Sequence, residues 1–276
     1  MFSKKITIAL MALLPMAARA APKDFKLSSP DGKVSAQINT GRQITWSVSF
    51  NGTTVIAPSE IAMHLMDGTA YDGGVKFQKA AKESVDETVS TVAYKKAKVR
   101  NHYNQLTLKY KTFDLIFRAY DQGVAYRFVS KATAPFQVRN EQASFNFAGD
   151  WQAFIPYVNK KVGASREEQF FNSFEKVYAQ EKLSAWEKGR LAFLPLAVKG
   201  PDGMLINITE SDLKDYPGMY LYNDGGNTVL EGVYAPYPKE VEQGGHIRIQ
   251  KIVTAREEYI AKAAPGQSFP WRIVTI

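Results

Sequence analysis

Apolar and polar residues alternate with a period of two along most of the chain, which is typical of β-strands with one buried face. Residues 44–50 show this most clearly, and they run into Asn51-Gly52, a dipeptide that favours the tight turn of a β-hairpin. No helical periodicity extends beyond a few turns. Segments of the same kind, bounded by turn residues, predict strands at 25–28, 34–39, 44–50, 53–56, 87–94, 106–110, 113–120, 123–130, 136–140, 143–147, 192–198, 204–208, 219–222, 228–234 and 247–254.

Many short strands with frequent turns predict an all-β fold, an antiparallel β-sandwich with short helical excursions. Residues 113–120 and 123–130 are separated by a turn at Asp121-Gln122 and predict a second hairpin. Residues 151–190 are more polar and irregular, so we expect a long excursion with short helical turns. Long structured loops are often functional or interfacial. Packing of this segment on its own aromatic residues is an equally good interpretation.

The first residues have the layout of a secretory signal. Lys4 and Lys5 precede an apolar run at 6–16, and Ala18-Arg19-Ala20 supplies the small residues that a signal peptidase reads. We therefore expect residues 1–20 to be removed and residues 21–276 to form one domain in the periplasm or outside the cell. No later apolar run predicts a membrane span.

The 276-residue chain contains no cysteine, which excludes disulfides and thiolate nucleophiles. Its formal net charge of +8 could suit a nucleic acid. However, the basic residues alternate with apolar ones, as in 108–111, and this is the pattern of a solvated sheet face. We therefore expect no nucleic-acid partner.

Three carboxylates occupy the turn between the apolar runs 204–208 and 219–221. They are Glu210, Asp212 and Asp215. A carboxylate just beyond a buried strand is held by rigid structure and can still reach a metal or a ligand. A polar turn with Asx-type capping explains the same residues without any ligand. Both interpretations stay open from the residues alone.

Several motifs in order resemble the amino-terminal domain of glycoside hydrolase family 97, over about residues 25–276. The most specific is Thr209-Glu210-Ser211-Asp212-Leu213 followed by Asp215-Tyr216-Pro217-Gly218-Met219. The others are Ser84-Val85-Asp86-Glu87-Thr88, Arg100-Asn101-His102-Tyr103-Asn104-Gln105-Leu106, Asp121-Gln122-Gly123-Val124-Ala125-Tyr126-Arg127 and Phe145-Asn146-Phe147-Ala148-Gly149-Asp150.

The resemblance implies a supersandwich like that of galactose mutarotase, packed on a catalytic (β/α)8 barrel. The family contains α-glucosidases and α-galactosidases, typically calcium-dependent and periplasmic. Its catalytic acid and its base or nucleophile lie in the barrel, so we expect no catalytic residue here and no hydrolysis by this chain alone. The terminal strand at 269–276 matches the one that leads into the barrel, so the chain looks like a fragment or an isolated domain.

By resemblance, Glu210 matches the glutamate that this domain gives to a calcium ion. One glutamate supplies at most two of the six to eight oxygens that calcium needs, so the site would be incomplete without the barrel. Contacts to an oligosaccharide or α-glycoside are expected from Glu231, Gly232 and Val233, a strand end beside an aromatic, proline-rich turn. Trp151, Tyr157, Trp186 and Tyr216 are further candidates for stacking on a sugar.

A stand-alone carbohydrate-binding protein, or a mutarotase-like epimerase, is the alternative. Such an isomerase needs a histidine and a carboxylate as acid and base. His102 is the candidate because, of the three histidines, it alone lies in a polar setting. If a barrel is the partner, at least two of the aromatic residues in 151–190 and 269–276 should be exposed near Glu210. These are Trp151, Phe154, Phe170, Phe171, Phe174, Trp186, Phe269 and Trp271.

Overall fold

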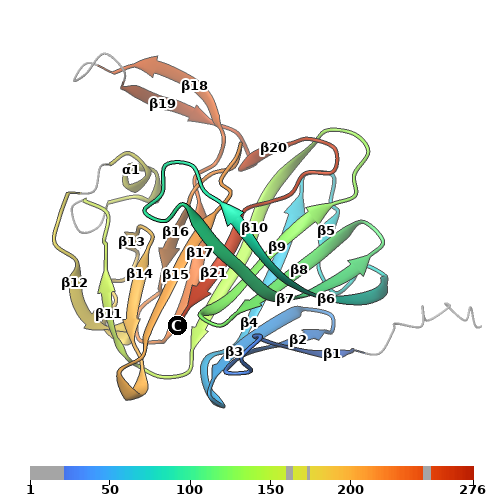
Figure 1. Ribbon diagram of the computed structural model, residues 1–276. Helices are drawn as coiled ribbons and strands as arrows, with labels where there is room; N and C mark the ends of the chain where they lie inside the picture. Colours follow the sequence, from blue (N-terminus) through green and yellow to red (C-terminus); the bar gives the residue numbers. More distant parts are fainter. Residues whose placement is uncertain (1–21, 160–163, 173–174, 245–249) are drawn as a thin grey trace, which may run out of the picture.

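The computed structural model describes residues 22–159, 164–172, 175–244 and 250–276, so the predicted signal segment 1–20 lies outside the described residues. Two antiparallel sheets face each other (Figure 1). In spatial order, the first sheet contains β1 (Asp24–Ser28), β2 (Val34–Thr40), β3 (Ile44–Phe50), β4 (Thr53–Leu65), β10 (Phe136–Phe147), β17 (Val229–Tyr234), β16 (Met219–Tyr222) and β13 (Leu191–Ala192), with β5 (Ala70–Tyr71) beside β4 and β20 (Ala261–Ala263) beside β10.

The last strand of the chain lies in the middle of the second sheet. In spatial order this sheet contains β12 (Ala179–Lys182), β11 (Gln152–Ile155), β14 (Leu196–Lys199), β15 (Leu205–Ser211), β21 (Trp271–Thr275), β9 (Gly123–Ser130), β8 (Phe113–Tyr120), β7 (Lys98–Tyr110) and β6 (Phe77–Ser90). A separate ribbon of β18 (Pro238–Gln243) and β19 (Lys251–Arg256) projects above the sandwich in Figure 1. The predicted antiparallel sandwich is therefore confirmed.

The two predicted hairpin turns are confirmed. Asn51 and Gly52 both have positive φ, 47° and 82°, and they join β3 to β4. This backbone matches the right-handed twist of the strands that it joins. The turn at Asp121-Gln122 joins β8 to β9. In β3 every second side chain from Ile44 to Val48 is buried, as the alternation predicts.

Several strand boundaries differ from the prediction. β4 and β7 are longer than the predicted 53–56 and 106–110, and the predicted strand 192–198 is divided between β13 and β14. Residues 247–249 of the predicted strand 247–254 lie outside the described residues. β10 is one strand where two were expected, because register shifts at 138–140 and 143–146 bend it without ending its pairing with β4. β6 begins at Phe77, ten positions before the predicted start, since most of its side chains are exposed and leave no alternation to read. The excursion contains the short helical turns α1 (Arg166–Phe170) and η1 (Leu183–Ala185), and it contributes β11 and β12. A further turn, η2 (Pro201–Gly203), follows it.

Aromatic side chains fill the space between the sheets around Trp46. Its ring centroid lies 5.1 Å from that of Tyr126 and 6.1 Å from that of Phe145. Such tilted and edge-on pairs stabilise a core beyond the area that they bury. Among the residues that the structure describes, no helix is long and apolar enough to cross a membrane.

The predicted exposure of aromatics near Glu210 is wrong for the described residues. Phe171 is 44% exposed, but Trp186 and Phe269 are only 3% and 1% exposed. Trp151, Phe154, Phe170 and Trp271 are half-buried, and Phe174 lies outside the described residues. The excursion folds back on the sheets and covers its own rings, as the edge-on contact between Tyr157 and Trp186 shows.

Candidate functional site

The acidic turn between β15 and β16 bends through two aspartates with left-handed backbone. Asp212 and Asp215 have φ of 60° and 50°, a conformation that aspartate tolerates better than most residues. Asp212 accepts a hydrogen bond of 2.8 Å from Arg127 on β9 and pairs with Lys214 at 3.2 Å. These bonds hold the pKa of Asp212 below its usual value. The turn is therefore fixed to the second sheet.

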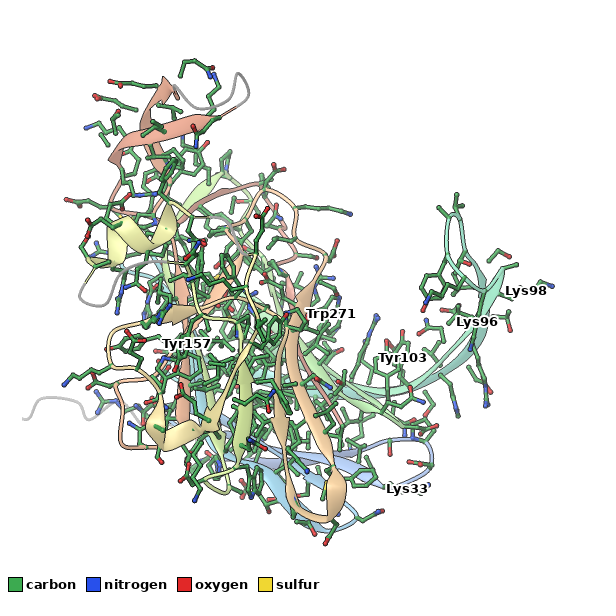
Figure 2. The ribbon with its side chains drawn as sticks, turned by 90° about the vertical axis from the view of Figure 1, so that its left-hand side faces the viewer. Lys33, Lys96, Lys98, Tyr103, Tyr157 and Trp271 are labelled. Carbon is green, nitrogen blue, oxygen red and sulfur yellow. The ribbon has the colours of Figure 1, made fainter. Side chains whose placement is uncertain are left out.

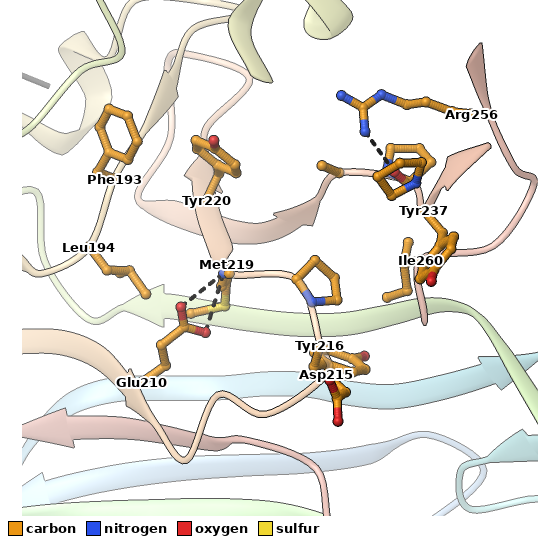
Figure 3. Close-up of a pocket in the computed structure, with 15 residues that line it drawn as sticks. Phe193, Leu194, Glu210, Asp215, Tyr216, Met219, Tyr220, Tyr237, Arg256 and Ile260 are labelled. Carbon is orange, nitrogen blue, oxygen red and sulfur yellow. Dashed lines mark hydrogen bonds between the residues drawn. The ribbon is translucent and has the colours of Figure 1, made fainter. Parts of the chain in front are cut away.

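Glu210 lies at the end of β15 and points inward rather than into solvent. Its carboxylate accepts hydrogen bonds from the backbone N–H of Met219, at 3.1 and 3.2 Å, and from Nη1 of Arg272 at 2.5 Å (Figure 3 shows the Met219 bonds). The side chain is 14% exposed. A carboxylate at a strand end beside a polar turn is expected to be exposed, and for Glu210 this expectation is wrong. The carboxylate nevertheless lines a pocket.

A buried ion-pair network lies beneath Glu210. Arg272 is fully buried and donates from Nε and Nη2 to the two oxygens of Glu141, at 2.8 and 2.7 Å. Tyr216 donates its hydroxyl to Glu141 at 2.8 Å. The guanidinium also faces the ring of Tyr234, 5.1 Å from its centroid. One guanidinium thus serves two carboxylates, and it is bidentate to only one of them.

Burial and the shared guanidinium of Arg272 shift the pKa values in this network. Burial raises the pKa of Glu210, and the nearby Glu141 adds to the rise, against the opposing effects of Arg272 and the Met219 N–H. Burial disfavours the charge of Arg272, but the adjacent Glu141 outweighs it and holds the Arg272 pKa well above the usual value. Burial therefore opposes the charge of Glu210, although this carboxylate contacts Arg272.

The pocket above the network has a volume of about 560 Å³. It combines aromatic rings with a few polar groups, as Figure 3 shows for its lining. Tyr220 lies 5.4 Å from Phe193 and 5.5 Å from Phe170, centroid to centroid. Rings beside a few fixed polar groups are the usual lining of a small-ligand site. The lining includes Phe193, Glu210, Asp215, Tyr216, Tyr220, Tyr237 and Arg256.

Arg256 is fixed at the edge of this pocket. It donates from Nε to both oxygens of Glu167, at 2.7 and 2.6 Å, and from Nη1 to the carbonyl of Pro236 at 2.7 Å. Its guanidinium also lies 5.5 Å from the Phe170 ring centroid. The ion pair with Glu167 therefore ties α1 to β19 at the edge of the pocket.

The structure does not bring Glu231, Gly232 and Val233 into this pocket. Glu231 accepts a hydrogen bond of 2.7 Å from Ser144 on β10. A Cβ at Gly232 would lie 3.1 Å from that of Ala143, so this position faces a neighbouring strand. The loop that follows does reach the pocket, through Ala235, Pro236, Tyr237 and Pro238.

The described residues do not by themselves form a calcium site. Among residues 22–159, 164–172, 175–244 and 250–276, no three histidines, cysteines or acidic residues converge in a way that could hold a metal ion. Glu210 already accepts from Arg272 and Met219, although a carboxylate has about four acceptor positions. It can contribute at most part of a site whose other ligands come from elsewhere.

The histidine proposed for an isomerase lies apart from the pocket. His102 is on β7 opposite Asp86, and it is not among the residues that line the cavity with Glu210. Of the predicted sugar-stacking residues, Tyr216 lines the pocket, whereas Trp151, Tyr157 and Trp186 do not.

Sequence reasoning missed Phe193, Tyr220, Arg256 and Arg272. For Arg272 the local alternation is misleading, because it favours an inward Trp271 and Ile273 and an outward Arg272. Arg256 and Phe193 come from segments far apart in the sequence, and no local pattern indicates that they meet.

Comparison with known proteins agrees with this architecture. The sequence profile described as "Glycosyl-hydrolase 97 N-terminal" matches residues 27–276. A retaining alpha-galactosidase of Bacteroides thetaiotaomicron is 42% identical over 274 residues, which are 99% of this chain and 41% of that protein. The chain thus spans about two fifths of the length of this curated relative.

Solved structures show the same fold at lower identity. A glycoside hydrolase family 97 enzyme from Pseudoalteromonas sp. strain K8, in complex with acarbose, superposes with a TM-score of 0.70 at 20% identity, over 91% of this chain and 35% of that one. A beta-arabinopyranosidase superposes with a TM-score of 0.72 at 22% identity, over 92% of this chain and 40% of that one.

Proposed function

Because the chain belongs to glycoside hydrolase family 97 and corresponds to its amino-terminal domain, we propose that it is a non-catalytic module that packs on a catalytic barrel and contacts the carbohydrate substrate. The observation that carries this proposal is the aromatic pocket at Glu210. The relative that shares 42% of its residues is named for α-galactoside hydrolysis, so an α-glycoside is the proposed ligand class.

The pocket has the chemistry that a saccharide needs. The rings of Phe193, Tyr220 and Tyr237 offer flat apolar faces for the C–H groups of a sugar ring. Arg256 and Glu210 offer a charged donor and a charged acceptor for hydroxyl groups. Both are held by other bonds, so little side-chain freedom is lost on binding.

Glu210 is also proposed as one calcium ligand, completed by carboxylates of the catalytic domain. Its free acceptor capacity toward the pocket supports this role. We propose export to the periplasm from the residues at 1–20, and we propose that the chain alone hydrolyses no α-glycoside. The chain alone should bind calcium weakly, because it offers only Glu210, which already accepts hydrogen bonds from Arg272 and Met219.

Saturation-transfer NMR with methyl α-galactoside and with maltose tests the sugar site. We expect transfer to the sugar protons with the unaltered chain and its loss in Tyr220→Ala. Tyr94→Ala is the matched control, because Tyr94 is 66% exposed and lies outside the pocket lining. Equal transfer in Tyr220→Ala and Tyr94→Ala would move sugar binding away from this pocket.

Calcium titration calorimetry tests the metal role. The chain is joined after Ile276 to the part of the α-galactosidase that follows the matched region. We expect tight binding in this fusion, weaker binding in its Glu210→Gln variant, and little heat with the chain alone. An unchanged affinity in the Glu210→Gln fusion would remove Glu210 from the proposed ligands.

A further inference from the structure

A second groove lies beside the first sheet, where the end of β4, the start of β10 and β20 meet. Its volume is about 400 Å³, and its lining includes Met66, Asp67, Phe136, Gln137, Lys262 and Ala263. The pocket at Glu210 has a different lining and shares none of these residues. The groove is therefore a separate surface that the sugar pocket does not explain.

Backbone hydrogen bonds fix the segments that line this groove. The N–H of Met66 donates to the carbonyl of Gln137 at 3.0 Å. Gln137 lies opposite Lys262 in the pairing of β10 with β20. Asp67 accepts a hydrogen bond of 2.8 Å from the N–H of Thr69, which fixes its carboxylate in the turn after β4. Because paired strands hold the groove in shape, a ligand loses little affinity in ordering it.

The groove combines one aromatic face with several polar groups. Phe136 is half-buried, and its ring meets that of the buried Phe269 edge-on, with 6.3 Å between the centroids. The side chains of Asp67, Gln137 and Lys262 are exposed. They offer a charged acceptor, an amide that donates and accepts, and a charged donor. A saccharide matches this set, because its hydroxyl groups donate and accept and its C–H groups pack on a ring.

Tyr237 and the segment that enters β20 connect the groove to the pocket at Glu210. Tyr237 and Ile260 line the pocket on the side opposite Phe193, as Figure 3 shows. The ammonium of Lys262, in the groove, lies 4.9 Å from the centroid of the Tyr237 ring. Ile260 and Lys262 are two positions apart, so at most about 7 Å of backbone separates the pocket from the groove. One ligand of several linked units can therefore reach both.

The ridge between the two surfaces is rigid. The N–H of Tyr237 donates to the carbonyl of Tyr259 at 2.7 Å, and the centroids of the two rings are 5.6 Å apart. The N–H of Ile260 donates to the carbonyl of Val138 on β10 at 2.8 Å. The separation of pocket and groove is thus fixed by the fold, so it selects ligands whose units are spaced to match.

We propose that the groove is a second saccharide subsite, which binds the continuation of an α-linked oligosaccharide whose end lies in the pocket at Glu210. This inference rests on the proposed function and adds the length of the ligand to it. A disaccharide occupies the pocket alone, whereas a longer chain crosses Tyr237 and reaches Lys262. The second contact is then intramolecular, so a longer chain gains affinity without any change in the pocket.

Titration calorimetry with saccharides of two lengths tests the subsite. The probes are maltose with maltotetraose and melibiose with stachyose, which cover α-glucosides and α-galactosides. In one of the two series we expect the tetrasaccharide to bind at least about tenfold more tightly than the disaccharide. In Gln137→Ala with Lys262→Ala this ratio should fall to about one, while the disaccharide Kd stays unchanged. Both side chains are exposed, so the fold should tolerate their loss.

Gln37→Ala with Lys98→Ala is the matched control, because it removes the same two residue types elsewhere. Gln37 is exposed on β2 and lines a different cavity. Lys98 lies toward the tip of the β6–β7 hairpin, which Figure 2 shows projecting from the body of the sandwich. This variant should keep the full dependence of affinity on ligand length.

Amide signals of the ¹⁵N-labelled chain give a second and local readout. The amides of Phe193 and Tyr220, in the pocket, should shift with both ligand lengths. Those of Met66 and Ala263, in the groove, should shift with the tetrasaccharide only. The subsite is overturned if these two signals stay in place, if both lengths bind the unaltered chain equally, or if Gln137→Ala with Lys262→Ala keeps the full ratio. An equal loss in the control variant overturns it too.

Tyr220→Ala separates this inference from the proposed function. It should weaken binding of both ligand lengths, because both use the pocket. If Tyr220→Ala changes nothing and Gln137→Ala with Lys262→Ala still weakens the tetrasaccharide, the groove is supported and the pocket at Glu210 fails as a sugar site. If no saccharide of either series binds, both proposals fail.

Discussion

Two adjoining regions of the sandwich interior, which meet at Tyr126, are built on opposite principles. Around Trp46 the core is aromatic and apolar, with ring pairs to Tyr126, Phe117 and Phe145. Around Arg272 the same two sheets enclose a guanidinium and the carboxylate of Glu141, which is 2% exposed. Removing volume from the first region costs burial and packing. Removing one partner from the second leaves a charge without its counterpart, which is more costly.

The largest effect is expected from Arg272→Met. This change leaves Glu141 buried, charged and unpaired, so we expect a loss of about 3–5 kcal/mol in the free energy of unfolding. Urea denaturation at neutral pH measures it. Arg139→Met, on the exposed side of β10, is the control and should stay within about 0.5 kcal/mol of the unaltered chain.

The double variant Arg272→Met with Glu141→Gln tests whether the unpaired charge of Glu141 causes this loss of stability. Removing the buried charge should recover part of the loss, because the penalty comes from an uncompensated ion. No recovery in the double variant would show that Arg272 acts by packing alone, and the contrast between the two regions would then lose its basis.

A smaller loss is expected from Ile38→Val in the apolar region. Ile38 is 1% exposed, and deletion of one buried methylene costs about 0.5–1.5 kcal/mol. This loss should be the same across the pH range in which carboxylates titrate, because no ionisable group changes its surroundings. A strongly pH-dependent loss would contradict the division of the core into an apolar and a charged region.

Glu210→Gln should change the free energy of unfolding modestly, by an amount that depends on pH. Burial raises the pKa of Glu210 above its usual value of 4.5. The folded state thus holds the proton more tightly than the unfolded chain does. Relative to the Gln variant, the unaltered chain should be most stable below about pH 4.5. It should lose that advantage as pH rises through the raised pKa.

Urea midpoints of the two proteins at several pH values check this trend, with Glu240→Gln on the exposed ribbon as the control. An advantage that grows with rising pH would mean that Arg272 outweighs burial at Glu210, and that the pKa of this carboxyl is lowered.

The smallest change in the free energy of unfolding is expected from Asp212→Asn. The bonds from Arg127 and Lys214 lower the pKa of Asp212 below 3.8. A partly exposed ion pair contributes about 0.2–1 kcal/mol. That contribution should be present above pH 3.8 and disappear as pH falls through the lowered pKa. Asp202→Asn, another aspartate with positive φ, is the control. A loss of the same size in both variants would point to backbone conformation rather than charge.

The apolar region could be predicted from the sequence, and the charged region could not. Trp46 sits in a strand whose alternation fixes its inward face, so its burial follows from local pattern. Arg272 is brought to Glu141 across 131 positions of sequence, and no local pattern encodes that contact. The acidic turn was found by its composition, but the inward direction of Glu210 depends on Arg272. The pocket rings Phe193 and Tyr220 likewise meet only because β13 pairs with β16.

The position of β21 also has a consequence for the order of synthesis. This strand is inserted between β15 and β9, which are about eighty positions apart in the chain, and it pairs with both. While the chain emerges from the ribosome, the two halves of the second sheet therefore cannot join until residues 271–275 have left the exit tunnel. The buried carboxylate of Glu141 also waits for Arg272 until then. Completion of this domain is thus timed to the moment at which, in the longer relatives, the next domain begins to be made.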